Sequence, residues 1–142
     1  MEKSTFKVVV SLLLLNEQNK VFLVRNHGTE RDINSYGVVS TYLSDDISVF
    51  SSVIDVAEKR LDISLNEKDL SVALCMQLKR EETSEIVFFV LTKKYKGSIV
   101  PDTNLYDDSM WAGMELLPLN TSDYIKKAIQ CYRKGITFTV FP

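Results

Sequence analysis

Short blocks of apolar residues, separated by polar turns, cover most of the chain, and in two places the apolar positions change to helical spacing. Blocks rich in Val, Leu, Ile and Phe are typical of strands. Apolar positions three and four residues apart are typical of a helix with one buried side. We therefore predict strands at residues 6–15, 21–25, 36–43, 70–78, 85–95 and 109–117, and helices at residues 49–61 and 123–134.

The central helix is the best-defined element of this pattern. Ser48 is a suitable N-cap, and the apolar spacing ends at Leu61. A wide apolar side predicts that this helix is deeply embedded. Its members are Val49, Val53, Val56, Ala57 and Leu61, with Phe50 and Ile54 beside them. The second helix should end at Gly135, because glycine readily takes the left-handed conformation of a helix C-terminus.

The elements follow the order β-β-β-α-β-β-β-α, in which groups of strands separate the helices. This order predicts an α+β fold, an α/β/α sandwich with a mixed β-sheet, in a single domain over residues 1–142. The polar turn at residues 16–19 predicts an antiparallel hairpin of the first two strands. The alternating tail, residues 136–142, is expected to dock as an edge strand or to cross to a partner chain.

Composition and charge exclude several classes of protein. With 142 residues, 45% of them hydrophobic, and a net charge of −2, the chain fits a globular domain and lacks the basic stripe of a nucleic-acid binder. The lysines at positions 93, 94 and 96 fit a solvated strand end. The two cysteines have no metal-binding spacing, and the single histidine argues against structural zinc. The apolar run at residues 8–15 is too short to span a membrane. We expect a cytoplasmic protein.

A family resemblance enters at the centre of the chain. Residues 25–29 read Arg-Asn-His-Gly-Thr, Asp32 follows, and residues 36–39 read Tyr-Gly-Val-Val. After them come aliphatic residues at positions 57, 61, 63 and 65, then Asp107-Asp108 shortly before Trp111, and a closing helix. This arrangement resembles the Nudix hydrolase family, whose box reads G-x5-E-x7-R-E-U-x-E-E-x-G-U, where U is aliphatic. The resemblance covers almost the whole chain and implies the Nudix fold.

The resemblance also implies a chemistry. Family members hydrolyse nucleoside diphosphates linked to another group, and box glutamates hold Mg²⁺ or Mn²⁺. In this register the glutamate positions of the helix hold Val56, Lys59 and Arg60, and the paired glycines are replaced by Ser40 and Thr41. Valine has no ligand atom, and two cations repel a divalent ion. We therefore expect no bound metal or other cofactor and a non-catalytic or weakly active nucleotide-binding domain.

In that interpretation cationic and polar side chains of the cleft hold a nucleotide or nucleotide sugar. The candidate ligand-binding residues are Arg25, Asn26, Tyr36, Lys59 and Arg60. No nucleic acid or membrane is expected as a partner.

Two alternatives remain open. In the first, the chain is a Mg²⁺- or Mn²⁺-dependent hydrolase with displaced carboxylates, and Glu58 and Asp55 are the candidate catalytic residues. Asp55, Glu58 and Asp62 are spaced to share one helix face, although a solvated face is the simpler interpretation. Glu81, Glu82 and Glu85 fit a solvated hairpin tip, or one of them an accessory acid. In the second alternative, the chain is a homodimeric interaction module that uses its apolar tail.

Overall fold

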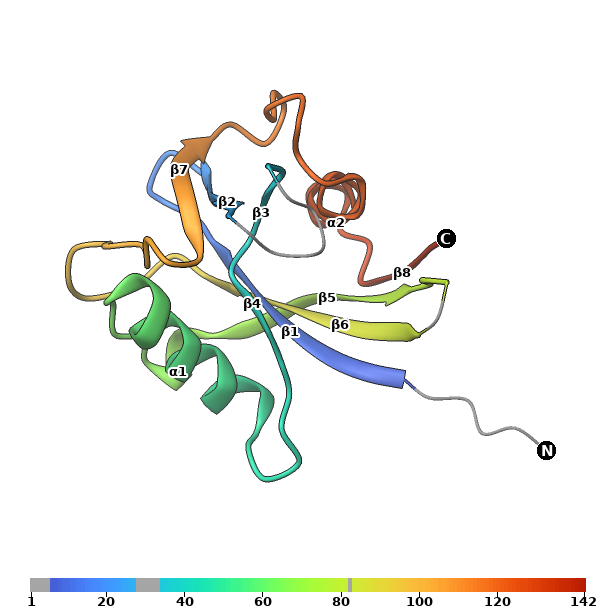
Figure 1. Ribbon diagram of the computed structural model, residues 1–142, viewed down its shortest axis with the longest axis horizontal. Coiled ribbons are helices and arrows are strands. Elements are labelled where there is room, and N and C mark those ends of the chain that lie inside the picture. Colours follow the sequence, from blue (N-terminus) through green and yellow to red (C-terminus); the bar gives the residue numbers. More distant parts are fainter. Residues whose placement is uncertain (1–5, 28–33, 82) are drawn as a thin grey trace.

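The computed structural model describes residues 6–27, 34–81 and 83–142 (Figure 1). It contains strands of two sheets, two α-helices and a short 3-10 helix, η1. In chain order the elements are β1 (Phe6–Leu14), β2 (Val21–Asn26), β3 (Tyr36–Gly37), β4 (Ser40–Tyr42), α1 (Val49–Leu61), η1 (Glu67–Asp69), β5 (Ser71–Leu78), β6 (Ser84–Thr92), β7 (Tyr106–Ala112), α2 (Asp123–Lys134) and β8 (Phe138–Phe141).

The larger sheet is mixed, as expected. Its strand order is β4-β1-β6-β5-β8, in which β1 and β6 are parallel and β5 and β8 are parallel, while the other two pairs are antiparallel. The smaller sheet is antiparallel, with the order β3-β2-β7. The helices α1 and α2 pack on opposite faces of the larger sheet, which confirms the α/β/α sandwich (Figure 1).

Strand alternation divides the interior into two cores, because successive side chains of a strand point to opposite faces. Leu13 of β1 packs with α2 residues such as Ile125 and Ile129. Leu12 and Leu14 pack with α1. β1 therefore has apolar side chains on both faces.

The predicted hairpin of the first two strands is wrong. The turn at residues 16–19 forms, with Asn19 at a φ of 58°, but β2 joins the smaller sheet and only Leu15 and Val21 bridge the two strands. The reason is that β4 and β6 occupy both edges of β1, so no edge remains for β2.

The predicted strand at residues 36–43 is divided in two. Tyr36 and Gly37 pair with β2 in the smaller sheet, whereas β4 pairs with β1 in the larger sheet. The buried residues Val38 and Val39 carry the chain from one sheet to the other, and the Leu12 amide donates to the Val39 carbonyl at 2.9 Å. The predicted strand at residues 109–117 is also displaced, since β7 begins at Tyr106 and ends at Ala112.

Both predicted helices are confirmed, including their ends. The Ser48 side chain accepts from the Ser51 amide at 3.1 Å, which caps α1. The predicted apolar residues Val53, Val56, Ala57 and Leu61 are buried. Gly135 ends α2 with a φ of 73°, the left-handed conformation expected there. The predicted tail docks on β5 as the edge strand β8.

Candidate active-site cleft

A cleft of about 300 Å³ opens between the edge of the larger sheet and the C-terminal end of α1. It brings together residues from β1, β2, β4, β6 and both helices. Its lining is Val9, Asn26, Ser40, Thr41, Tyr42, Arg60, Arg80, Glu85 and Tyr124. Of the residues proposed from the sequence as ligands, Asn26 and Arg60 lie here. The division of residues 36–43 into two strands places Ser40 and Thr41 on the cleft wall.

Arg60 extends from the last turn of α1 into this cleft. Its Nη1 donates to the Ser40 carbonyl at 2.6 Å and to the Tyr106 hydroxyl at 3.3 Å. Tyr106 is buried, and this burial raises the pKa of its phenol. Arg60 therefore joins α1 to β4 and β7 and places a permanent positive charge in the cleft.

The lining of the cleft also contains a buried carboxylate. Glu85 is 4% exposed, and its carboxylate accepts from the Tyr42 hydroxyl at 3.1 Å and from Arg80 Nε at 3.3 Å. The Arg80 guanidinium also lies over the Tyr124 ring, at 5.6 Å from the ring centroid. Glu85 is thus not part of a solvated hairpin tip, and Arg80 and Tyr42 hold its carboxylate in the lining of the cleft.

The sequence interpretation assigned no ligand role to Arg80, Tyr42 or Tyr124. One signal for Glu85 was available: it precedes Val87 and Phe89 at every second position, so it continues the buried side of β6. No comparable pattern identifies Arg80 or Tyr124. Arg80 lies in the turn between β5 and β6 and Tyr124 lies in α2, and only tertiary packing brings these two segments together at the cleft.

Arg25 and Tyr36 form a separate cluster with carboxylates of β7. Arg25 Nε pairs with Asp107 Oδ1 at 2.6 Å, and the guanidinium lies 5.7 Å from the Tyr36 ring centroid. The Tyr36 hydroxyl donates to Asp108. This hydrogen bond raises the pKa of Tyr36 and lowers the pKa of Asp108. Neither Arg25 nor Tyr36 lines the cleft; each already has a protein partner next to it.

The remaining candidate residues lie on the outer side of α1. The Lys59 side chain is 73% exposed and pairs with Asp55 at 3.0 Å, and Glu58 is also exposed. Asp62 lies beyond the helix as its C-cap, with a φ of 59°, so it does not continue the face of Asp55 and Glu58. Gly28, Thr29 and Asp32, which contributed to the family resemblance, and Glu82 lie outside the described residues.

Comparison with solved structures identifies the fold. The MutT protein of Methanosarcina mazei Go1 has a TM-score of 0.82 at 12% identity, over 94% of this chain and 97% of the other. The MutT NUDIX hydrolase of Burkholderia pseudomallei has a TM-score of 0.80 at 11% identity, over 89% and 98%. The chain has the Nudix hydrolase fold. A UDP-X diphosphatase shares it at a TM-score of 0.65 and 12% identity, over 99% of this chain and 70% of the other.

Sequence comparison adds no closer relative: no protein-family model and no curated protein matches the chain. The Nudix fold is therefore established by the structural likeness alone. Neither helix of the described residues is long and apolar enough to cross a membrane.

The Nudix fold implies a divalent metal, and the donor set along α1 does not fit one. Val56 is buried in the core beneath α1, Lys59 points to solvent, and Arg60 lines the cleft with a guanidinium in place of a carboxylate. Within residues 6–27, 34–81 and 83–142, no three His, Cys, Asp or Glu side chains are grouped so that they could hold a metal ion. Mg²⁺ and Mn²⁺ require several oxygen ligands, and a guanidinium supplies none.

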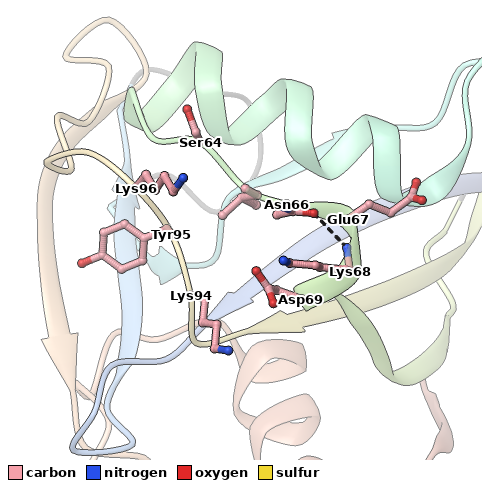
Figure 2. A pocket seen from close by; sticks show the side chains of 9 residues that line it. Ser64, Asn66, Glu67, Lys68, Asp69, Lys94, Tyr95 and Lys96 are labelled. Atoms are coloured by element: carbon pink, nitrogen blue, oxygen red, sulfur yellow. Dashed lines mark hydrogen bonds between the residues drawn. The ribbon is translucent and has the colours of Figure 1, made fainter.

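A second hollow, of about 540 Å³, lies away from this cleft between residues 64–69 and residues 94–96 (Figure 2). Lys68 and Lys96 direct their amino groups toward the space between the two segments, and Lys94 points away (Figure 2). Glu67 and Asp69 also line it, so its charge is mixed. This arrangement agrees with the solvated, lysine-rich strand end predicted from the sequence.

Proposed function

We propose that this Nudix-fold chain binds the phosphate of a nucleotide or nucleotide sugar in the cleft around Arg60, without a divalent metal, and has little or no hydrolytic activity. The observation that carries the proposal is the position of Arg60, whose guanidinium is anchored to the Ser40 carbonyl inside the cleft. Here a fixed side-chain cation would take the place that a metal ion takes in a hydrolase.

The chemistry of Arg60 suits this role. A guanidinium has five N–H donors, and the two hydrogen bonds of Arg60 both start from Nη1. Its Nη2 and Nε donors can therefore meet phosphate oxygens in the paired geometry that arginine favours. Because Ser40 holds Nη1 in place, little side-chain freedom is lost when an anion binds.

The rest of the lining fits the organic part of such a ligand. Tyr42 and Tyr124 offer aromatic surface, and Asn26, Ser40 and Thr41 offer polar groups. We therefore assign Asn26, Arg60, Arg80, Tyr42 and Tyr124 as the binding set. Arg25 and Tyr36 are assigned to support of the neighbouring wall, and Lys59 takes no part.

The alternative, a hydrolase with displaced carboxylates, has less support. Asp55 faces outward and pairs with Lys59, and Asp62 ends the helix in a left-handed conformation. A metal held by these residues would lie outside the cleft. This alternative predicts Mg²⁺- or Mn²⁺-dependent release of a nucleoside monophosphate that Glu58→Gln abolishes.

A thermal-shift series tests the proposal. Nucleoside monophosphates, nucleoside diphosphates and nucleotide sugars are added at millimolar concentration with EDTA or with Mg²⁺. A ligand at about ten times its Kd stabilises the folded state by about 1.4 kcal/mol, which raises Tm by a few degrees. We expect the same shift in EDTA and in Mg²⁺, and no product.

Two matched variants locate the site. Arg60→Gln should abolish the shift, and Lys59→Gln, which removes the same charge one residue away, should leave it unchanged. Arg80→Gln should weaken binding without removing the α1 anchor. The proposal fails if no ligand stabilises the protein, or if Lys59→Gln lowers affinity as much as Arg60→Gln.

A further inference from the structure

The outer edge of β8 is open. This strand is the last of the larger sheet and pairs in parallel with residues 75–78 of β5 (Figure 1). In the described part of the chain no strand pairs with its other side. The strand reads Phe-Thr-Val-Phe, so it carries no charge that would repel a second strand.

The hydrogen bonds to β5 decide which backbone groups remain available. The carbonyls of Thr137 and Phe141 accept from the amides of Cys75 and Lys79, each at 2.9 Å. In a parallel pair, alternate residues of a strand direct both backbone groups to the same neighbour. Thr139 therefore also faces β5, and Phe138 and Val140 direct their N–H and C=O groups to the open edge.

The side chains of these two residues are also uncovered. Phe138 is 56% exposed and Val140 is 42% exposed. They lie on the face of the sheet that α1 covers elsewhere. Phe138 pairs with Cys75 of β5, Cys75 with Phe88 of β6, and Phe88 with Val10 of β1, which packs in the core under α1. Val140, two residues further along β8, points to the same face. The helix α1 packs on β1, β4 and β6 and does not reach this end of the sheet (Figure 1).

We propose that a second copy of this chain pairs with β8 in antiparallel orientation, around a two-fold axis at Thr139. In this register Phe138 of one chain lies opposite Val140 of the other, and each such pair exchanges both outward backbone hydrogen bonds. The two larger sheets then form one continuous sheet. The sequence predicted that the tail docks as an edge strand or crosses to a partner chain. In this arrangement it docks as an edge strand within its own chain, and its open side forms the contact with the second copy.

Self-complementarity favours a second copy over an unrelated strand. An isologous contact requires a patch that matches itself under a two-fold rotation. The outward groups of Phe138 and Val140 are equally spaced about Thr139, so they meet this condition. Each opposed pair brings the aromatic side chain of Phe138 next to the β-branched side chain of Val140, a combination that stabilises antiparallel strands.

The small size of the contact is typical of weak, transient interfaces. A four-residue strand and its flanking residues bury roughly 400 Å² per copy, about half of the 800 Å² per partner of a standard interface. The exposed Ile136 beside β8 adds apolar surface. The dimer should therefore be reversible and should form at high micromolar concentration.

Sedimentation velocity and amide hydrogen exchange over a concentration series test the proposal. We expect a shift from monomer to dimer, accompanied by rising protection of the Phe138 and Val140 amides. The Thr139 amide already bonds within the chain, so its protection should not change. Val140→Pro removes one outward N–H, spares the bonds to β5 and should abolish dimerisation. Phe138→Lys should do the same, whereas Leu119→Lys, at a loop residue that is 97% exposed, should not.

Several results would overturn the proposal. The protein could remain monomeric at the highest concentration, or form a dimer that both β8 variants retain. A dimer lost in Phe138→Lys and kept in folded Val140→Pro would indicate contact through the sheet face, not through the strand edge. Unchanged protection of the Phe138 and Val140 amides in a dimer would also exclude pairing through β8, whatever the variants do.

Discussion

Replacement of Arg60 by methionine should destabilise the protein far more than the same replacement of Lys59. Methionine keeps the apolar part of either side chain and removes its charge. Arg60→Met removes two hydrogen bonds from a charged donor, at 2.6 Å to the Ser40 carbonyl and at 3.3 Å to the Tyr106 hydroxyl. Lys59→Met removes one exposed ion pair with Asp55, at 3.0 Å.

These contacts give different magnitudes. A hydrogen bond from a charged donor contributes about 1.5–3 kcal/mol, and the longer bond to Tyr106 contributes at the low end or less. Arg60 is half-buried, so we expect Arg60→Met to lower the free energy of unfolding by about 2 kcal/mol. An exposed ion pair one helical turn apart contributes only about 0.3–0.5 kcal/mol. In a domain of this size the two changes correspond to losses in Tm of about 6–8 °C and about 1–2 °C.

Urea unfolding followed by circular dichroism measures both values. The slope of the free energy against urea should be the same in all three proteins, so that the midpoints are comparable. Equal losses for Arg60→Met and Lys59→Met would refute the reasoning, because they would show that Arg60 is solvated like its neighbour. A loss limited to Lys59→Met would refute it as well.

Three further predictions concern local contacts. Tyr36→Phe should destabilise the protein at neutral pH, because its hydrogen bond lowers the pKa of Asp108 and raises that of Tyr36. The difference from the native protein should shrink as pH falls from about 3.9, the pKa of an unfolded aspartate, toward the lower pKa of folded Asp108. It should also shrink as pH rises from about 10, the pKa of an unfolded tyrosine, toward the higher pKa of folded Tyr36; a constant difference in pH-dependent unfolding would contradict this. Ser48→Ala should cost about 1 kcal/mol in urea unfolding, and Ser122→Ala much less, since only Ser48 makes a side-chain cap bond. Asp62→Gly should keep or raise Tm, because glycine adopts the left-handed conformation without strain; a clear loss would assign the Asp62 carboxylate a role that its position as C-cap does not explain.

Local pattern predicted the helices and most strands because these depend on residues close in sequence. Ser48, the apolar stripe from Val49 to Leu61 and Gly135 each define a helix boundary through their own backbone or side chain. The sheet partner of β2 depends instead on which edges of β1 are already paired. That competition involves β4 and β6, which are distant in sequence, so no turn at residues 16–19 could reveal it.

The cleft was predictable only in part, for the same reason. Arg60 and Asn26 were identified because the family resemblance assigns their positions to the central box and the loop before it. Lys59 was grouped with Arg60 as an adjacent cation, yet successive helix residues differ by about 100° in direction, and the two side chains diverge. Arg80, Tyr42 and Tyr124 come from three separate elements that only tertiary packing brings together.

The most direct test of metal-free binding is isothermal titration calorimetry of the best ligand from the thermal-shift series, carried out first in EDTA and then in excess Mn²⁺. We predict the same Kd in both buffers, with unchanged ligand recovered afterwards. Binding that requires Mn²⁺, or recovery of a nucleoside monophosphate from the Mn²⁺ titration, would contradict the assignment of Arg60 as the phosphate-binding cation.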